Sequence, residues 1–520
     1  MSAQISRKYL TLDNGGTNTK ALLFDDGGRL LAQSSFPTAW IQPAPGMREI
    51  DVYALRESLF QAIRDVLGQA SLTGNDIDCI TCVGHGKGLY VLDRHGRIGR
   101  HGIMSTDNRA KDLAVSFERR IEEIYPLSAQ HVMPGQAPVL LRWLKDHEPE
   151  SYATIGSVLS AKDFVRFLLS GDIHQEIGDA SGNNLVNLHT RNYDGRLFDF
   201  FGIQEMRDCM PDLVESDSIV SRVSQEAAQV TGLRAMTPIT GGLFDIDAGT
   251  LGMGVLDDSK FAIIAGTWNI NVYPAAQPCA PAPGIMNSLF CNHQTLIEAS
   301  SPTSAGNLDI ILPLLIPDRI AQCKAEGISI YAALEEMLSS SLASPSAVVF
   351  FPFLYGSNSD PYATGSFLGL DSTTTRDQLI TAVYEGIAFA HRQHVEQLQA
   401  TRQSRPCAMR ISGGASNSPA WMQLFSNILN ASVQTLQQQE SSGLGGAIVS
   451  ATATHRYESL SEAARCMVGI AHSYEPDVQA VRRYEHKYRM YRNMLSALEG
   501  HWGSGMQTTN QHHNHENEVQ

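Results

Sequence analysis

The sequence predicts an α/β protein of two domains that share a duplicated core. A chain of 520 residues is too long to fold around one hydrophobic core. Strand-like and helix-like hydrophobic patterns alternate along its first part, as they do in α/β folds. An apolar run, a Gly-Thr turn and an alternating strand occur at Gly16-Thr17 and again at Gly266-Thr267, roughly 250 residues apart. One copy per domain explains the repeat, and a coincidence of two short patterns is the alternative.

The first element is a pair of strands joined by a glycine turn. An apolar run from Tyr9 carries Asp13 into Gly15-Gly16-Thr17, and a second apolar run returns to Asp25. A tight turn without bulky side chains exposes backbone N–H groups and a hydroxyl, which suits a phosphate. The acid beside the turn suits a magnesium ion held partly through water. A second hairpin is expected at Gly27-Gly28, and an ordinary glycine-turn hairpin is the alternative interpretation of the first.

Later elements of the first half carry clear boundary signals. Asp51 precedes a helical apolar stripe from Leu55 to Leu67, as an N-cap residue does. The other expected elements are a strand at 77–83 that ends in the glycine-rich segment 84–88, a helix around Trp143 that ends near Pro149, a helix at 161–170, a loop at 182–184 and a glycine-rich zone at 241–254.

The second half begins with the repeated hairpin pattern at 261–272. Thr375 and Gln378 match a capping box at the start of a long helix. A strand at 408–411 leads to a glycine pair, and Ser418 before Pro419 indicates the next helix start. Residues 440–447 are interpreted as a glycine-rich turn that opens a helix of small residues.

These patterns place the domain boundary near residues 256–259, where Asp257-Asp258 interrupts the apolar pattern. The predicted units are an N-terminal domain at 1–256, a C-terminal domain at 257–499 and a tail at 500–520. The series of Gln, Asn and His residues in the tail indicates disorder.

The composition, 43% hydrophobic and 18% charged, is that of a soluble globular protein. With 39 basic and 54 acidic residues the net charge is −15, which disfavours nucleic acid as a partner. No apolar stretch is long enough to span a bilayer. Of the eight cysteines only Cys79 and Cys82 stand close together, without the second pair that a zinc site needs. We therefore expect a cytoplasmic protein with reduced thiols and no membrane partner.

Seven short motifs follow one another along the chain, and each alone occurs in many folds. They are Asp13-x-Gly-Gly-Thr17, residues 84–88, residues 105–109, residues 241–245, Ala265-Gly266-Thr267, residues 412–415 and residues 443–447. In this order and at these separations they resemble the FGGY family of carbohydrate kinases, over residues 8–495. Segments 86–88, 140–149, 242–245, 298–303 and 353–358 are most similar to the L-xylulose kinases of that family.

The resemblance implies two actin-like (ribonuclease H-like) domains, with ATP and a sugar meeting in the interdomain cleft. It implies that Asp245 is the catalytic base, because this residue follows Gly241-Gly242 with the spacing of the family's catalytic aspartate. A carboxylate suits this task, since it can take the proton as the sugar hydroxyl attacks. The neighbouring Asp247 is the competing candidate.

For the nucleotide, the resemblance implies that Asp13 orients Mg²⁺ while Gly16 and Thr17 face one side of the triphosphate. Gly266 and Thr267 would approach from the other domain. Gly413, Gly414 and Asn417 lie at a predicted helix start. They would meet the nucleotide, because helix N-termini attract negative charge. A plain turn is the alternative for each glycine taken alone.

For the sugar, the expected side chains are Lys87, Asp107 and Arg109, with Phe244 as a wall, since polyols need donors and acceptors side by side. Two residues depart from the family pattern. His85 stands where glutamine is usual, and Lys87 stands where many pentulose kinases carry histidine. A solvated Lys87 is therefore the alternative.

The expected activity is transfer of the γ-phosphoryl group of ATP to a terminal hydroxyl of a ketopentose, with L-xylulose first. Another pentulose, glycerol or a four-carbon polyol is the alternative acceptor, and a homodimer is possible. Two alternative hypotheses belong to functional classes other than sugar kinases. One is an actin- or chaperone-like ATPase, and the other is a sugar sensor without turnover. The polar set at Lys87, Asp107 and Arg109 disfavours the ATPase, and the presence of Asp13 with Asp245 disfavours the sensor.

Overall fold

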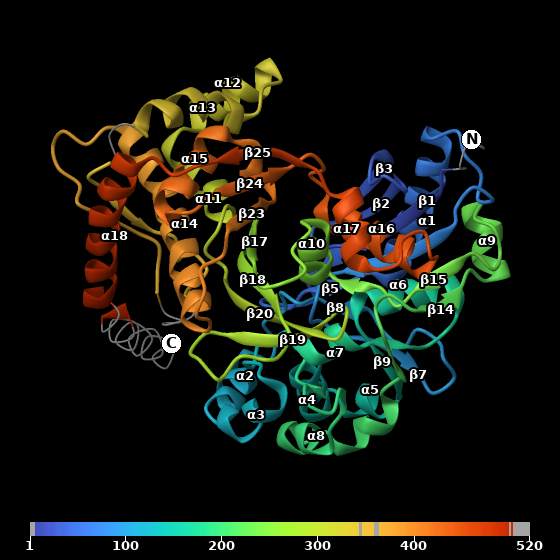
Figure 1. The fold of residues 1–520 in the computed structure, drawn as a ribbon. Coiled ribbons are helices and arrows are strands. Elements are labelled where there is room, and N and C mark those ends of the chain that lie inside the picture. Colours follow the sequence, from blue (N-terminus) through green and yellow to red (C-terminus); the bar gives the residue numbers. More distant parts are fainter. Residues whose placement is uncertain (1–5, 343–345, 358–362, 499–500, 503–520) are drawn as a thin grey trace.

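A computed structural model gives the structure of residues 6–342, 346–357, 363–498 and 501–502. Two seven-stranded sheets lie on either side of helix α10 (Asp245–Gly252), one on the left and one on the right of Figure 1. The predicted disordered tail falls outside the described residues except for His501 and Trp502. Trp502 packs edge-on against Phe353, with ring centroids 5.7 Å apart, so the packed part of the chain continues past the predicted limit at 499.

The N-terminal sheet contains the opening hairpin of the sequence. Strands β1, β2 and β3 form an antiparallel meander, and β6 and then β15 add parallel to β1. Both hairpins predicted in this region, at Gly15-Gly16 and at Gly27-Gly28, are confirmed. The strands are β1 (Lys8–Asn14), β2 (Asn18–Asp25), β3 (Leu30–Pro37), β6 (Cys79–Gly84), β14 (Ile219–Arg222), β15 (Pro238–Thr240) and β16 (Leu243–Phe244), the last also paired with β6.

The C-terminal sheet repeats this arrangement. An antiparallel meander of β17, β18 and β20 is followed by β23 and then β24, which run parallel to β17. The same order of antiparallel and parallel strands in both sheets confirms the predicted duplication. The strands are β17 (Lys260–Ala265), β18 (Asn269–Ala275), β19 (Met286–Phe290), β20 (Gln294–Ser301), β23 (Ala408–Ser412), β24 (Val433–Leu436) and β25 (Ile470–Tyr474).

Helices cover both sheets, and the three predicted helix starts are confirmed. Asp51 caps α1, Thr375 and Gln378 form the capping box of α14, and Ser418 caps α15. In the first half the helices are α1 (Val52–Gln69), α2 (Lys111–Glu118), α3 (Tyr125–Ser128), α4 (Ala137–His147), α5 (Pro149–Ala153), α6 (Ala161–Ser170), α7 (Ile177–Gly182), α8 (Gly195–Phe201) and α9 (Gln225–Thr231). In the second half they are α11 (Gly306–Leu315), α12 (Pro317–Glu326), α13 (Ile330–Ser341), α14 (Arg376–Ala400), α15 (Pro419–Leu429), α16 (Ser441–Ala453), α17 (Leu460–Met467) and α18 (Val478–Leu498).

Short strands and 3-10 turns complete the fold. A separate hydrophobic core joins α2, α4 and α8 in a lobe below the N-terminal sheet (Figure 1). The remaining elements are β4 (Trp40–Ile41), β5 (Glu49–Ile50), β7 (Tyr90–Asp93), β8 (Gly102–Ile103), β9 (Ile155–Leu159), β10 (Gln175–Glu176), β11 (Val186–Asn187), β12 (Asn192–Tyr193), β13 (Leu213–Val214), β21 (Val349–Phe351), β22 (Ser366–Leu368), η1 (Ile121–Glu123), η2 (Gln204–Cys209) and η3 (Gly414–Asn417).

The glycines at 443–446 lie inside helix α16 rather than in the turn that the sequence suggested. They let α16 pack very closely on its neighbours. A Cβ on Gly445 would stand 2.0 Å from the carbonyl oxygen of Ala248 in α10, and one on Gly446 would stand 2.5 Å from the Thr11 methyl group in β1. Helix α16, late in the sequence, therefore packs on the N-terminal sheet, and α17 lies beside it (Figure 1).

One hydrophobic core joins residues from both halves of the chain, including Leu22, Ala248 and Leu444. The predicted boundary at 256–257 lies between the end of α10 at Gly252 and the start of β17 at Lys260. It stays a prediction, because a single cut at this point leaves α16 and α17 on the sheet of the other half.

Candidate active site

The two acids that the sequence singled out lie at the same edge of the N-terminal sheet. Strands β1 and β16 both run parallel to β6, and Asp13 and Leu243 both pair with Val83. Asp13, the next-to-last residue of β1, therefore lies at the same sheet edge as Phe244, which leads into Asp245, the first residue of α10. The carboxyl ends of parallel strands meet at one edge of a sheet, where α/β proteins place their ligands.

The carboxylate of Asp245 sits in a setting that favours its protonated form. Burial, together with the charges of Asp13 and Asp179, raises its pKa to about 7, while the Ile246 N–H group and Lys87 oppose this rise. The two carboxylates of Asp245 and Asp13 therefore lie close enough for their charges to interact. A carboxyl group that titrates near neutral pH is suited to accept a proton.

The carboxylate of Asp13 is crowded by protein atoms, although the residue keeps partial exposure. Burial raises its pKa to about 6, with Lys20 lowering it and Glu440 raising it. Lys20 lies opposite Asp13 across the hairpin, and its ammonium group is 2.8 Å from the carboxylate of Glu440. Since Glu440 caps α16, this ion pair links the opening hairpin to the C-terminal half.

The two glycine hairpins leave their backbones open. The Gly15 N–H group donates to the Asn18 carbonyl at 3.0 Å and closes the first turn. No atom lies within 4 Å of the position that a Cβ would take on Gly16, Gly266 or Gly414. Thr17 and Thr267 are exposed next to two of these glycines. This open backbone next to an acid at a strand end fits a nucleotide with its metal ion.

Gly413 brings the third predicted turn against the second hairpin. Its φ of +95° needs glycine, and a Cβ there would lie 2.8 Å from the Ala265 carbonyl oxygen. Asn417 is exposed and accepts a hydrogen bond from the Gln439 side chain at 2.5 Å. Since Gln439 precedes Glu440, the turn at 413–417 connects to the Lys20 ion pair and so to the opening hairpin.

The helix start predicted after this turn lies at Ser418-Pro419 as expected, but Gly413, Gly414 and Asn417 precede it. Residues 414–417 form the 3-10 turn η3, and α15 begins only at Pro419. The first N–H groups of α15 already have partners, since the Ser418 side chain accepts from Trp421 at 3.0 Å and Glu335 accepts from Ala420 at 2.7 Å. A nucleotide would therefore meet η3 rather than the end of α15.

A small cavity opens beside Asp245 with about 250 Å³ of empty space, including the part open to solvent. Two of the predicted sugar residues line it, Lys87 in a left-handed conformation (φ 63°) and Phe244. Gly86 is required here, because a Cβ on it would lie 2.1 Å from the Phe244 ring. The lining residues come from both halves of the chain and are Gly86, Lys87, Gln130, Asp179, Gly182, Phe244, Ser288 and Glu298.

Asp107 and Arg109, the other predicted sugar residues, bind each other instead of lining this cavity. The Arg109 Nη2 atom is 2.9 Å from Asp107 Oδ2 and 2.8 Å from Glu49 Oε1. The guanidinium stacks over the Trp143 ring at 5.2 Å, and Asp107 also accepts from the Arg48 N–H group at 2.6 Å. Their polar atoms bind other protein groups, and neither residue lines the cavity. Their sugar-binding role therefore stays a prediction.

Two further residues, like Asp245 itself, are not among the cavity-lining residues. His85 is buried, contacts the Tyr90 hydroxyl at 3.2 Å, and has its pKa lowered to about 4 by burial. Asp247 is buried with neither carboxylate oxygen bonded, and burial together with Glu176 and Asp179 raises its pKa well above the ordinary value. Asp247 is 1% exposed whereas Asp245 keeps partial exposure, which favours Asp245 between the two competing acids.

Four polar residues of the cavity were missed from the sequence: Gln130, Asp179, Ser288 and Glu298. Glu298 begins one of the segments that carry the family resemblance, which could have drawn attention to it. Asp179 carries no local signal, because it reaches the cavity only through the packing of α7.

A wider hollow, with about 930 Å³ of empty space, lies on the outer side of the C-terminal half between α13 and α14. None of the predicted site residues lines it, so the smaller cavity beside Asp245 is the candidate sugar site.

Among residues 6–342, 346–357, 363–498 and 501–502, no group of three His, Cys, Asp or Glu side chains is arranged to hold a metal ion. In the same residues no helix has the length and apolar character needed to cross a membrane.

Comparison with known proteins identifies the family. Residues 8–252 match the N-terminal domain, and residues 261–454 the C-terminal domain, of the FGGY family of carbohydrate kinases. The chain belongs to this family. This FGGY kinase is 31% identical over 500 residues to the L-xylulose/3-keto-L-gulonate kinase of Escherichia coli K12, covering 95% of this chain and 98% of that protein. It is 30% identical over 494 residues to a probable L-xylulose kinase of Pasteurella multocida, covering 94% and 99%.

A solved structure gives the fold class. The ligand-bound xylulose kinase of Lactobacillus acidophilus superposes with a TM-score of 0.86 at 22% sequence identity, covering 96% of this chain and 99% of that one. The predicted fold class, α/β with two actin-like domains, is confirmed. The FGGY kinase is an ATP-dependent carbohydrate kinase that acts on a small-molecule sugar.

Proposed function

We propose that this FGGY kinase phosphorylates a terminal hydroxyl of a ketopentose, with L-xylulose as the preferred acceptor. The observation that carries the proposal is the position of Asp245, with its raised pKa, beside a small cavity lined by polar side chains from both halves. Two relatives at about 30% identity over nearly the whole chain have L-xylulose in their names, which supports this acceptor.

In the proposed reaction Asp245 accepts the proton of the sugar hydroxyl as that oxygen attacks the γ-phosphorus. The ionised form of Asp245 is the competent one, because only a carboxylate can take the proton. Phe244 stands beside it as a wall that holds the sugar and keeps water from the reacting oxygen.

The proposed nucleotide site uses the open turns. Gly16 and Thr17 would contact the phosphates from one side and Gly266 and Thr267 from the other, as their open backbones allow. Gly413, Gly414 and Asn417 would meet the rest of the nucleotide. Asp13 would hold Mg²⁺ partly through water, and the ion would supply neutralisation of phosphate charge.

Lys87 favours a second candidate acceptor, a keto sugar that carries a carboxylate. Lys87 is the one cation among the residues that line the described cavity. A relative named L-xylulose/3-keto-L-gulonate kinase supports a test of such an acceptor. Substitution Lys87→Met should raise the KM for 3-keto-L-gulonate more than the KM for L-xylulose. An equal effect on both sugars would mean that Lys87 does not bind the carboxylate.

Coupled ADP release, measured with ATP, Mg²⁺ and a panel of pentuloses, polyols and keto sugar acids, tests the function. Sugar-dependent release with L-xylulose as the best acceptor supports the proposal. Release that is independent of every sugar would favour an ATPase, and a best acceptor such as glycerol would overturn the ketopentose. The proposed location is the cytoplasm, where ATP is available. The expected homodimer is tested by analytical sedimentation, which gives the mass of the particle in solution.

A further inference from the structure

A buried carboxylate on α7 forms part of the wall of the sugar cavity. Asp179 is 1% exposed and lines the cavity together with Lys87 and Phe244. It also lies close enough to Asp245 for its charge to raise the pKa of that acid. Asp179 is therefore a neighbour of both the proposed sugar and the proposed base.

The acceptor capacity of Asp179 is only partly used inside the protein. Its Oδ1 atom accepts from the Asn183 side chain at 3.0 Å, and its Oδ2 atom accepts from Lys162 Nζ at 3.3 Å. A carboxylate offers about four acceptor positions. The side chain thus keeps capacity for hydroxyl donors in the cavity that it lines.

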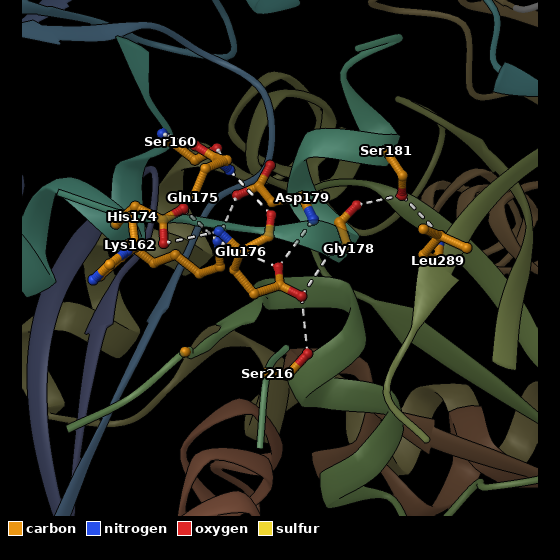
Figure 2. Close-up of polar contacts among 12 residues, drawn as sticks. Ser160, Lys162, His174, Gln175, Glu176, Gly178, Asp179, Ser181, Ser216 and Leu289 are labelled. Carbon is orange, nitrogen blue, oxygen red and sulfur yellow. Dashed lines mark hydrogen bonds and ion pairs between the residues drawn. The ribbon is translucent and has the colours of Figure 1, made fainter. Parts of the chain in front are cut away.

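A fully buried lysine holds this carboxylate in place. Lys162 Nζ lies 2.8 Å from Asp163, 3.3 Å from Asp179 and 3.4 Å from Glu176, and the Lys162 side chain is 0% exposed. Burial alone would lower the pKa of Lys162, but the three carboxylates outweigh burial and raise it above its ordinary value. Lys162 is therefore a fixed positive charge next to the carboxylate of Asp179 (Figure 2).

Helix α7, which carries Asp179, is anchored at both ends. At its start Glu176 accepts from the N–H groups of Gly178 at 2.8 Å and Asp179 at 3.0 Å. Near its end the Ser181 hydroxyl accepts from the N–H group of Leu289 in the C-terminal sheet at 2.8 Å (Figure 2). These contacts fix the direction of the Asp179 side chain before any ligand enters.

We propose that Asp179 binds a sugar hydroxyl and that Lys162 is a positioning residue that holds Asp179 for this contact. This inference rests on the proposed sugar kinase function. A fixed carboxylate accepts hydroxyl hydrogen bonds without reorganising, which favours sugars whose hydroxyl meets it. At neutral pH the carboxylate is largely ionised, because burial and neighbouring acids raise the pKa of Asp179 only to about 6.

The first test is Asp179→Asn, which keeps the size of the side chain and removes its charge. Steady-state kinetics with L-xylulose should show a KM for the sugar raised roughly 10- to 100-fold, the loss expected for a hydrogen bond to a charged group. The KM for ATP should stay within about threefold of the wild-type value. A sugar KM within about threefold of wild type would overturn the inference.

Asp163→Asn is the matched control. Asp163 contacts the same Lys162 ammonium, at 2.8 Å, but is not among the cavity-lining residues. Its loss should lower the melting temperature, because Asp163 also pairs with Arg166 at 2.7 Å, and should leave the sugar KM within about threefold of wild type. A sugar KM that rises as much in Asp163→Asn as in Asp179→Asn would mean that Asp179 acts only as a counter-ion.

The positioning role is tested by Lys162→Met alone and together with Asp179→Asn. The paired variant removes one charge of each sign, so it keeps the test decisive if Lys162→Met alone fails to fold. If Lys162 acts through Asp179, the sugar KM of the pair equals that of Asp179→Asn. A further rise in the pair of more than about threefold would overturn the positioning role.

The two levels of the proposal fail in different ways. Wild-type protein that phosphorylates no sugar of the panel would overturn both the function and this inference. Wild-type turnover of L-xylulose with an unchanged KM in Asp179→Asn would overturn this inference alone.

Discussion

Replacement of Asp245 by asparagine removes the proposed proton acceptor while it leaves the shape of the crevice intact. Asp245 begins α10 at the sheet edge that also carries Asp13. Because the pKa of Asp245 is raised to about 7, about half of the wild-type molecules hold the competent carboxylate at pH 7, and nearly all hold it at pH 8. Asparagine cannot take the proton at any pH.

The expected loss in kcat is roughly 10²- to 10⁴-fold at pH 8, the usual contribution of a general base. The KM for ATP should change little, since the glycine turns at Gly16 and Gly266 are untouched. Coupled ADP release at saturating ATP and varied L-xylulose gives both constants, and nucleotide binding by calorimetry checks that the variant is folded.

The matched control is Asp247→Asn, two residues along the same helix. Asp247 is 1% exposed whereas Asp245 keeps partial exposure, so kcat of the Asp247→Asn variant should stay within about tenfold of wild type. Either of two results would refute the assignment of the base: an Asp245→Asn variant within about tenfold of wild-type kcat, or an Asp247→Asn variant that loses as much as Asp245→Asn.

Three more perturbations test other parts of the structure. Since only ionised Asp245 accepts a proton, kcat/KM for the sugar should rise with pH, bend near its pKa of about 7 and level off above; a flat profile from pH 5 to 8 would contradict this. Gly445→Ala should lower the free energy of unfolding, measured in urea, by about 1–3 kcal/mol, because its Cβ would lie 2.0 Å from the Ala248 carbonyl oxygen. Gly68→Ala is the control: no neighbouring atom lies within 4 Å of its Cβ position, so it should stabilise α1 by about 0.5–1 kcal/mol. Asp13→Asn should raise the Mg²⁺ concentration needed for half-maximal rate about tenfold or more, and an unchanged requirement would place the ion elsewhere.

The hairpins and helix starts could be predicted because their causes are local. Gly15-Gly16 and Gly27-Gly28 form turns through their own backbone freedom, and Asp51 caps α1 through contacts two and three residues away. The repeated pattern at Gly266 likewise depends on neighbours in sequence. Residues of this kind need no distant partner, so the chain itself specifies their structure.

One error arises where glycine acts at long range. The glycines at 443–446 were interpreted as a turn, yet they serve the close approach of α16 to α10 and β1, and the two uses look alike in sequence. The sugar-binding role expected for Asp107 and Arg109 stays a prediction, since their side chains pair with each other and with Glu49.

The sugar cavity could be predicted only in part for the same reason. Phe244 and Lys87 stand next to motifs that the family resemblance brings out, and both line it. Asp179 and Glu298 reach it from α7 and β20, elements that meet only when the two halves of the chain pack together. No spacing along the chain encodes such a meeting.

Crystals of the wild-type protein with Mg²⁺, a non-hydrolysable ATP analogue and L-xylulose would show most directly whether the Asp245 carboxylate lies within reach of the attacking sugar hydroxyl. The expected result is a terminal sugar hydroxyl within roughly 2.6–3.2 Å of Asp245, with the metal ion on the side of Asp13. A sugar bound outside the cavity of Lys87 and Phe244, or with no hydroxyl within reach of Asp245, would contradict it.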